Sequence, residues 1–399
     1  MSSVPNLQEL SFYHELISEN NHCSKINKMN RKKFLAVAGG TFVVAGVTYY
    51  LSSDKSNFIR ADTQPIDVTK APLTPDENEI LFLASLAPSG HNAQPWFVKY
   101  LGTYHWIIGN DKSKWLMGVD PTQRETILSI GAFIQNLEYA ANHLDYDCVF
   151  KLLAKNNQDE EIMEVKLSKS SSVSDFDIEK IKLRRTVRTH YMNEILKSED
   201  INYLTNDAPS FIKYLPNTST AHQYLNEQTI EANKIQSYRD NAQRELADWI
   251  RFSSADARKY RDGLTMASME ITGTSTWVLR NFYNKQNVMA TNFRNQNIEN
   301  VKKEVAQSAG WFLITSKDDS IASLIETGKH LQRLWLKVRD KNIAIHPMTQ
   351  ILEEPKTNQE VNQNLGVKEP IQFILHTAYV KEYPKPVSLR RSVEAFVRV

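Results

Sequence analysis

From residue 73 onward, short apolar runs of strand length alternate with longer amphipathic stretches. Apolar residues at helical spacing predict helices, and β-branched and aromatic runs between turn residues predict strands. The predicted helices are 75–87, 120–144, 176–183, 219–252 and 318–340. The predicted strands are 96–101, 104–109, 149–153, 162–167, 311–315 and 371–380. Because these elements lack a regular strand–helix–strand period, the pattern predicts an α+β fold.

Three capping signals give the expected starts of the main helices. They are Thr74-Pro75, Asp120-Pro121 and Asp318-Asp319, which place a capping side chain or a proline at a helix start. The helices 120–144 and 318–340 each carry a wide apolar stripe that needs a partner. We therefore expect these two helices to pack together between two halves of the chain.

The N-terminal region differs in composition from the rest of the chain. Residues 1–28 are polar and rich in Ser and Asn, which predicts disorder. Residues 29–51 hold Arg31-Lys32-Lys33 before the apolar stretch 34–51, and this order is typical of an export signal. The segment resembles a twin-arginine signal in which lysine replaces the second arginine. An uncleaved membrane anchor stays open, because roughly 18 helical residues span ~27 Å of a ~30 Å hydrocarbon core. A buried core helix is the third alternative.

These features divide the chain into segments with different expected roles. An exported or anchored chain would hold its folded part outside the cytoplasm, in the periplasm or cell envelope; a cytoplasmic location is the alternative. The expected segments are a disordered N-terminus (1–28), a signal or anchor (29–51), a linker (52–72), a first half (73–174) and a second half (175–399), with a candidate lid at 253–300.

Composition excludes several classes of protein. Hydrophobic residues make up 41% and charged residues 24% of the 399 residues, as in soluble globular proteins. The 48 basic and 46 acidic residues give a net charge of +2, which argues against a nucleic-acid partner. Only Cys23 and Cys148 are present, so no disulfide framework is expected. The ten histidines show no ligand spacing, and we expect no metal site.

Three polar motifs are candidates for a binding site. The turn 87–96 presents Ser, His, Asn and Gln after a helix end, although it equally fits a helix C-cap leading into a strand. The segment 184–188 holds three arginines and a threonine, which suit a phosphate because guanidinium binds two oxygens at once. A solvated helix terminus is the alternative there. The third motif, 390–392, also fits an ordinary C-terminal tail.

Taken together and in this order, the motifs resemble those of nitroreductase-family flavoproteins. The resemblance covers roughly residues 73–399 and includes the segments 120–132 and 328–350. It is closest to the exported, single-chain Acg-like branch, whose two halves mimic the usual homodimer. It implies a nitroreductase-like fold in which two half-domains form an intramolecular pseudodimer around a flavin site.

The resemblance also implies a cofactor and its contacts. FMN would lie between the halves. Its phosphate would be faced by Arg184, Arg185, Thr186, Arg390 and Arg391, and Arg188 would lie near the pyrimidine edge of its ring. The turn 88–92 would lie against the ring and the ribityl chain. No side chain is expected to be catalytic, because the flavin carries the chemistry. The implied cofactor-binding residues are Pro88, Ser89, Gly90, Asn92, Arg184, Arg185, Thr186, Arg188, Pro347, Arg390 and Arg391.

The implied function is an FMN-dependent oxidoreductase. It would pass hydride or electrons from NAD(P)H or another donor to a flat, quinone-like or nitroaromatic acceptor. Without a Gly-x-Gly-x-x-Gly fingerprint, NAD(P)H is expected only as a transient substrate. One alternative is a flavin-binding or flavin-sequestering protein whose lid covers a catalytically silent FMN. A scaffold of this fold that has lost the cofactor is another.

Overall fold

The computed structural model describes residues 53–54, 56–62, 72–171 and 174–399. The predicted disordered N-terminus, signal or anchor segment and Cys23 all lie outside these residues. Among the described residues, no helix has the length and apolar character needed to cross a membrane. Described residues of the segment 52–72, which we interpret as a linker, contact the rest of the chain: Asp54 accepts hydrogen bonds from Ser254, and Arg60 donates to the Lys182 carbonyl.

The first sheet is built by the N-terminal half of the described chain and is closed at one edge by the C-terminus. Its strand order is β12-β1-β2-β4-β3, and only the β12–β1 pair is parallel. The helices α2 (Pro75–Ser85) and α3 (Arg124–His143) accompany this sheet. The strands are β1 (Trp96–Gly102), β2 (His105–Asn110), β3 (Tyr146–Leu152), β4 (Glu161–Lys169) and β12 (Val397–Arg398).

The second sheet is wholly antiparallel and has the order β10-β11-β9-β6, with β5 (Tyr191–Met192) paired to the end of β11. The helix α12 (Ile321–Lys337) lies between β9 and β10 in the chain. The strands are β6 (Ile212–Pro216), β9 (Gly310–Thr315), β10 (Ile343–Pro347) and β11 (Ile371–Val380).

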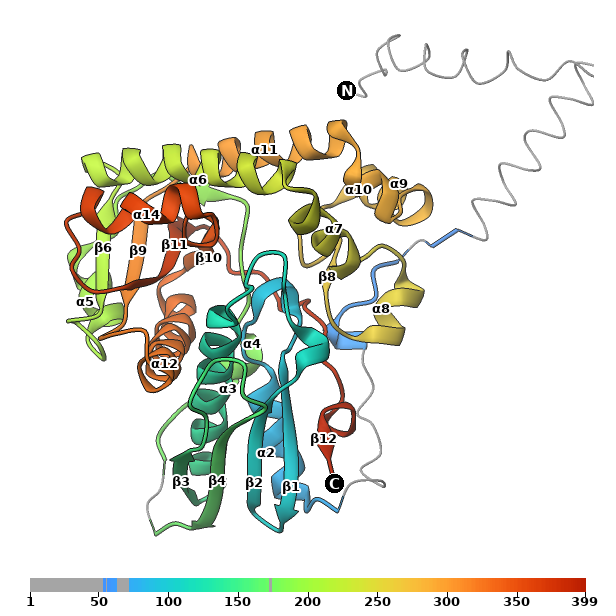
Figure 1. The fold of residues 1–399 in the computed structure, drawn as a ribbon, viewed down its shortest axis with the longest axis vertical. Helices are drawn as coiled ribbons and strands as arrows, with labels where there is room; N and C mark the ends of the chain where they lie inside the picture. The colour runs from blue at the N-terminus through green and yellow to red at the C-terminus, as the bar shows by residue number, and fades with distance from the viewer. Residues whose placement is uncertain (1–52, 55, 63–71, 172–173) are drawn as a thin grey trace, which may run out of the picture. The chain divides into compact units, whose positions relative to one another are not determined.

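The two halves follow one plan. In the first, β1 and β2 precede α3, then β3 and β4 complete the sheet in the order β1-β2-β4-β3. In the second, β6 and β9 precede α12, then β10 and β11 give the corresponding order β6-β9-β11-β10. The chain therefore contains an internal structural repeat, visible in Figure 1 as two sheets on either side of the α3–α12 pair. The α+β class predicted from the sequence is confirmed.

One long segment breaks the symmetry between the halves. Thr103-Tyr104 joins β1 to β2, whereas residues 217–309 join β6 to β9 and form what we call the inserted segment. Its helices α6 and α11 lie side by side at the top of Figure 1, and the candidate lid 253–300 is part of it. Its elements are α6 (Thr220–Tyr238), α7 (Asp240–Trp249), β7 (Ile250–Arg251), α8 (Ser254–Tyr260), β8 (Leu264–Thr265), α9 (Gly273–Phe282), α10 (Lys285–Met289) and α11 (Thr291–Val305).

The helices α3 and α12 cross in direct backbone contact at two glycines. A Cβ placed on Gly131 would lie 2.2 Å from the carbonyl oxygen of Ile325 and 3.0 Å from the Cα of Gly328. A Cβ on Gly328 would lie 2.0 Å from the carbonyl oxygen of Leu128. No larger residue fits at this crossing without moving a helix. The expected packing of these two helices is confirmed.

Several predicted boundaries are wrong for local reasons. The first long helix was predicted to begin at residue 120, but it begins at Arg124 because Pro121 lies in a preceding turn. The Asp120 carboxylate accepts a hydrogen bond from the Thr126 amide at 3.0 Å. The second begins after Ser320, which is its N-cap. The predicted helix 219–252 is interrupted at Arg239, whose extended backbone separates α6 from α7.

Other elements match the prediction or were missed. The helix after Thr74 has a complete capping box with Glu77, and β11 has the predicted bounds. The strands β6 and β10 were not predicted. The predicted helix 176–183 is limited to α4 (Glu179–Leu183). The helices α8, α9, α10 and α11 begin within the candidate lid 253–300, for which no elements were predicted. Further helices that were not predicted are α5 (Ser198–Thr205), α13 (Gln350–Glu353) and α14 (Pro355–Asn364).

The glycine crossing gives a prediction about stability. Gly131→Ala should lower the free energy of unfolding by about 1–3 kcal/mol, because the added methyl group overlaps the α12 backbone. Gly102→Ala is the matched control, since nothing lies within 4 Å of its added Cβ. Chemical denaturation measures both. Equal stability of the two variants would contradict the close crossing, and Gly131→Ala/Gly328→Ala should lose less than the sum of its single losses.

Candidate functional site

The turn that follows α2 has an unusual backbone. His91, Asn92 and Gln94 have φ of 48°, 54° and 55°, in the left-handed region that costs non-glycine residues roughly 1 kcal/mol or more each. The Ser89 hydroxyl accepts a hydrogen bond from the Gln94 amide at 2.9 Å, which braces the turn. A strained turn of this kind persists only when surrounding groups hold it, and two distant segments of the chain do so here.

Arginines from two distant segments meet at the end of α2. Arg184 Nη2 donates to the carbonyl oxygen of Leu86 at 3.0 Å, and Arg390 Nη2 donates to the same oxygen at 3.2 Å. Arg390 also binds the carbonyl of Ala87 at 3.0 Å and the side-chain oxygen of Asn92 at 2.7 Å. Three motifs that the sequence singles out, up to 304 positions apart, are thus brought together.

The positive charges of Arg184 and Arg390 are not neutralised by a carboxylate among the described residues. Arg184 and Arg390 are both buried, and neither forms an ion pair with a carboxylate among the described residues. Burial, followed by the neighbouring charge of Arg60, lowers the pKa of Arg184 to about 9. Burial and then Arg184 lower the pKa of Arg390 well below its usual value. The carbonyls at the end of α2 offset these charges only partly, so the site favours an additional anion.

Arg391 has a different role in the fold. Its guanidinium donates to the carbonyl oxygens of Gln94 at 2.5 Å and Trp96 at 2.8 Å, and its amide donates to the Gln94 side chain at 2.9 Å. These bonds attach the C-terminal segment, and hence β12, to the first sheet.

The middle arginine motif surrounds a carboxylate from the inserted segment. Arg185 Nη2 lies 2.6 Å from Glu270 Oε1, and Arg188 donates its amide to Glu270 Oε2 at 2.9 Å. The Thr189 hydroxyl donates to the same oxygen at 2.7 Å. Thr186 contributes its carbonyl oxygen, which accepts from Arg185 Nε at 3.1 Å. Neither Glu270 nor Thr189 was predicted, and the sequence carries no local signal for them.

Pro347 is the last residue of β10. Two residues later, the Thr349 hydroxyl lies 3.3 Å from Glu125 Oε1 at the start of α3. The other oxygen of Glu125 lies 3.6 Å from where a Cβ on Gly90 would be. Glu125 therefore lies between the Gly90 turn of the first half and the segment after Pro347 in the second.

Glu125 belongs to a group of carboxyls with Glu353, which is half-buried, and Asp120, which is buried. The Thr349 hydroxyl also lies 2.9 Å from Glu353, so one hydroxyl contacts two acids. Burial, and then Glu125, raise the pKa of Glu353 well above its usual value. Burial, and then Glu125, raise the pKa of Asp120 to about 7. Glu353 and Asp120 therefore retain protons at pH values where isolated carboxyls are ionised.

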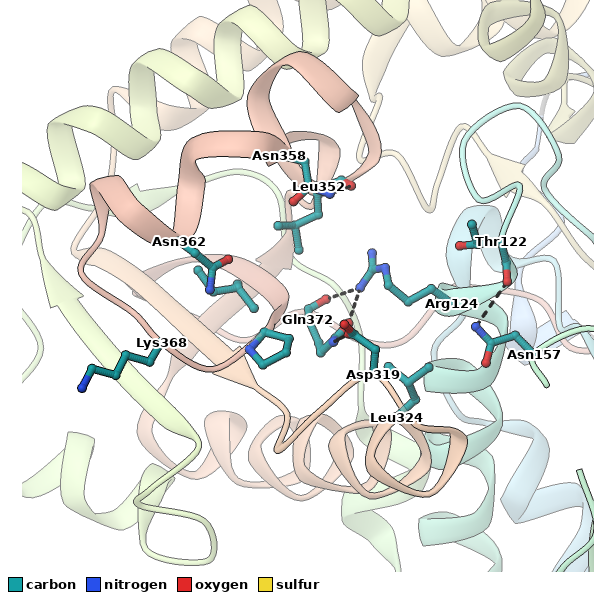
Figure 2. A pocket seen from close by; sticks show the side chains of 12 residues that line it. Thr122, Arg124, Asn157, Asp319, Leu324, Leu352, Asn358, Asn362, Lys368 and Gln372 are labelled. Atoms are coloured by element: carbon teal, nitrogen blue, oxygen red, sulfur yellow. Dashed lines mark hydrogen bonds between the residues drawn. The ribbon is translucent and has the colours of Figure 1, made fainter. Parts of the chain in front are cut away.

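A cavity of about 610 Å³ lies beside this group, between the start of α3 and the segment that leads into β11 (Figure 2). Within it, Arg124 Nη1 donates to both the carbonyl and the side-chain oxygen of Gln372 at 2.9 Å. None of the predicted cofactor-binding residues lines this cavity. Its lining is Thr122, Arg124, Asn157, Asp319, Leu324, Leu352, Asn358, Asn362, Lys368, Pro370, Ile371 and Gln372.

Comparison with known proteins identifies a distant relative. No family model matches the chain. A protein from Serratia sp. described as a probable NAD(P)H nitroreductase, PigM, is 24% identical over 292 residues, which cover 68% of this chain and 79% of that protein. The chain is thus distantly similar to a protein described as a probable nitroreductase. The Acg-like branch and the export signal remain predictions.

Two solved structures are also similar. A nitroreductase-like family protein from Bacillus cereus has a TM-score of 0.31 at 11% identity, with 57% of this chain and 98% of that chain covered. The FMN-dependent nitroreductase NfnB from Mycobacterium smegmatis, solved with NADPH, has a TM-score of 0.35 at 15% identity, with 55% and 96% covered.

The raised pKa of Asp120 predicts a pH dependence of stability. Between its ordinary pKa of 3.8 and its folded value of about 7, the native state binds more protons than the unfolded state. The free energy of unfolding should therefore fall as pH rises through this window. Asp120→Asn should flatten that fall, as measured by urea unfolding at pH 5 and pH 7.5. Parallel pH profiles for the variant and the wild type would refute the assignment.

Proposed function

We propose that this protein is an FMN-dependent oxidoreductase of the nitroreductase type. It passes hydride or electrons from NAD(P)H, or another donor, to a flat quinone-like or nitroaromatic acceptor. The observation that carries the proposal is the meeting of Arg184 and Arg390 at the end of α2, where Arg390 also binds Asn92 of the turn 88–92. Homology to a protein described as an NAD(P)H nitroreductase supports the same reaction class.

The donor set fits the phosphate of FMN. Arg184 and Arg390 are buried cations without a carboxylate partner among the described residues, and the Nε atom of Arg390 is buried without an acceptor. A phosphate supplies the negative charge and the acceptor oxygens that this pair needs. Beside them, Arg185, the Arg188 amide and the Thr189 hydroxyl already hold an anion, the carboxylate of Glu270.

The chain's own residues have binding and orienting roles in this proposal. Bound FMN supplies two-electron redox chemistry, so the protein needs no nucleophile or metal of its own. Arg184, Arg185, Thr186 and Arg390 would hold the phosphate end, and Arg391 would keep the C-terminal segment that carries Arg390 in place. Pro88, Ser89, Gly90 and Asn92 from the first half would approach the ring and ribityl chain, and Pro347 would border the ring from the second half.

Arg188 has a different role from the other arginines in this proposal. A fixed cation near the pyrimidine edge of the ring would stabilise negative charge there, which favours acceptance of electrons. In the structure its guanidinium donates to the carbonyl of Ser268 at 2.9 Å, so the inserted segment determines its direction.

A flavin-sequestering protein is the second candidate. The contact of Glu270 with Arg185 and Arg188 favours it, because the inserted segment reaches the proposed cofactor site and could restrict access to it. The two candidates share the FMN site and differ only in whether a donor reaches the ring.

Removing one phosphate ligand tests the site. Arg184→Ala should raise the FMN dissociation constant by at least about tenfold, because a charge-assisted hydrogen bond contributes ~1.5–3 kcal/mol. Arg244→Ala is the control, since it removes the same charge from an exposed position on α7. Flavin fluorescence quenching measures affinity, and thermal melting verifies folding. Unchanged FMN affinity in folded Arg184→Ala would remove this residue from the site.

Anaerobic reduction separates the two candidates. Protein loaded with FMN should lose its yellow absorbance when NADPH is added and regain it with a quinone acceptor. Stable yellow colour with NADPH, together with bleaching by dithionite, would instead support sequestration, because a small reductant would reach a ring that the nucleotide cannot. Protein that binds no FMN would exclude both candidates.

A further inference from the structure

The Glu270 carboxylate is bound in the way that a protein binds an anionic ligand. Both of its oxygens are used: one by the Arg185 guanidinium at 2.6 Å, and the other by the Arg188 amide at 2.9 Å and the Thr189 hydroxyl at 2.7 Å. A guanidinium, a main-chain amide and a hydroxyl are the donors that proteins use for phosphate oxygens. The carboxylate thus takes up donors from the motif that we propose for the phosphate end of FMN.

This ion pair is enclosed. The side chains of Arg185 and Glu270 are only 8% and 9% exposed. Removing two charges from water is costly, and only close pairing with further hydrogen bonds compensates it. Arg185 makes those further bonds to the carbonyls of Lys385 and Thr186. The pair is therefore satisfied as it stands, in contrast to Arg184 and Arg390.

The backbone that carries Glu270 is strained. Its φ is 59°, in the left-handed region, and Gly273 follows with φ of 69°. A left-handed glutamate costs roughly 1 kcal/mol or more. Here it closes a turn in which the amides of Glu270 and Ile271 donate to the carbonyls of Ala267 and Met266 at 3.1 and 3.0 Å. The three hydrogen bonds of the Glu270 side chain then hold this turn against the segment 185–189.

We propose that Glu270 is a built-in competitor for the FMN phosphate. The carboxylate and a phosphate cannot share these donors, because both are anions and would occupy the same positions. FMN binding then displaces Glu270 and releases the loop 266–272, so that phosphate binding controls the position of the inserted segment. This inference rests on the proposed function and adds a regulatory contact to it.

The experiment compares FMN with riboflavin, which lacks the phosphate. Glu270→Gln keeps the side-chain shape and removes its charge, and it should lower the FMN dissociation constant by about tenfold, as one released charge-assisted contact allows. Riboflavin affinity should stay unchanged. Glu299→Gln is the matched control, because it removes a charge from an exposed pair with Lys302 in the same inserted segment.

The outcomes distinguish the competitor from other roles of Glu270. If Glu270→Gln tightens both flavins equally, the residue only restricts access and the competition is wrong. Weaker or equal FMN binding would show that Glu270 positions the arginines, which also overturns the inference but leaves the proposed function intact. If neither wild type nor variant binds FMN, both proposals fail.

A measurement on the wild-type chain avoids any folding defect of the variant. Hydrogen exchange in a peptide spanning 266–272 should become faster when FMN is added and should not respond to riboflavin, because only the phosphate displaces Glu270. Slower or unchanged exchange with saturating FMN would overturn the displacement.

Discussion

The close crossing of α3 and α12 fixes the two halves of this protein relative to each other. Gly131 and Gly328 let the backbones touch, so no side chain separates the two helices at this crossing. A hydrogen bond at 2.7 Å between the buried side chains of Gln332 and Asn136 adds a specific polar contact farther along the same interface. Because this contact is rigid, the second half can place its extensions against the first half reproducibly.

Those extensions create the candidate site. Arg184 lies beyond the last strand of the first half, and Arg390 lies beyond the last strand of the second, so they occupy comparable positions in the repeat. Both nevertheless bind the same carbonyl at the end of α2. The cost of burying two like charges together is what makes this location chemically distinctive, since an anion is the natural complement of such a pair.

Part of this arrangement can be predicted from the sequence. Local signals are strong at Thr74, whose side chain and Glu77 form the capping box, and in the largely apolar sequence of β11. The arginine motifs can be recognised in the sequence, because a guanidinium group can bind an anion wherever the fold places it. By contrast, β6 is short, and Glu270 follows no recognisable pattern. Its partners come from a segment 81 or more positions away in the chain, and only tertiary packing brings them together.

The inserted segment makes the two halves of the repeat different from each other. A plain repeat of two halves would offer two equivalent positions, one beside each sheet. Here the inserted segment joins β6 to β9 only, and its Glu270 reaches the arginines beyond β4. The C-terminal segment also returns to the first sheet, where Arg391 and β12 attach it. Arg184 and Arg390 meet at the end of α2, and Glu270 binds the neighbouring residues Arg185 and Arg188. These contacts therefore lie on one side of the repeat only, and under the proposed function this asymmetry would give one cofactor site in each chain.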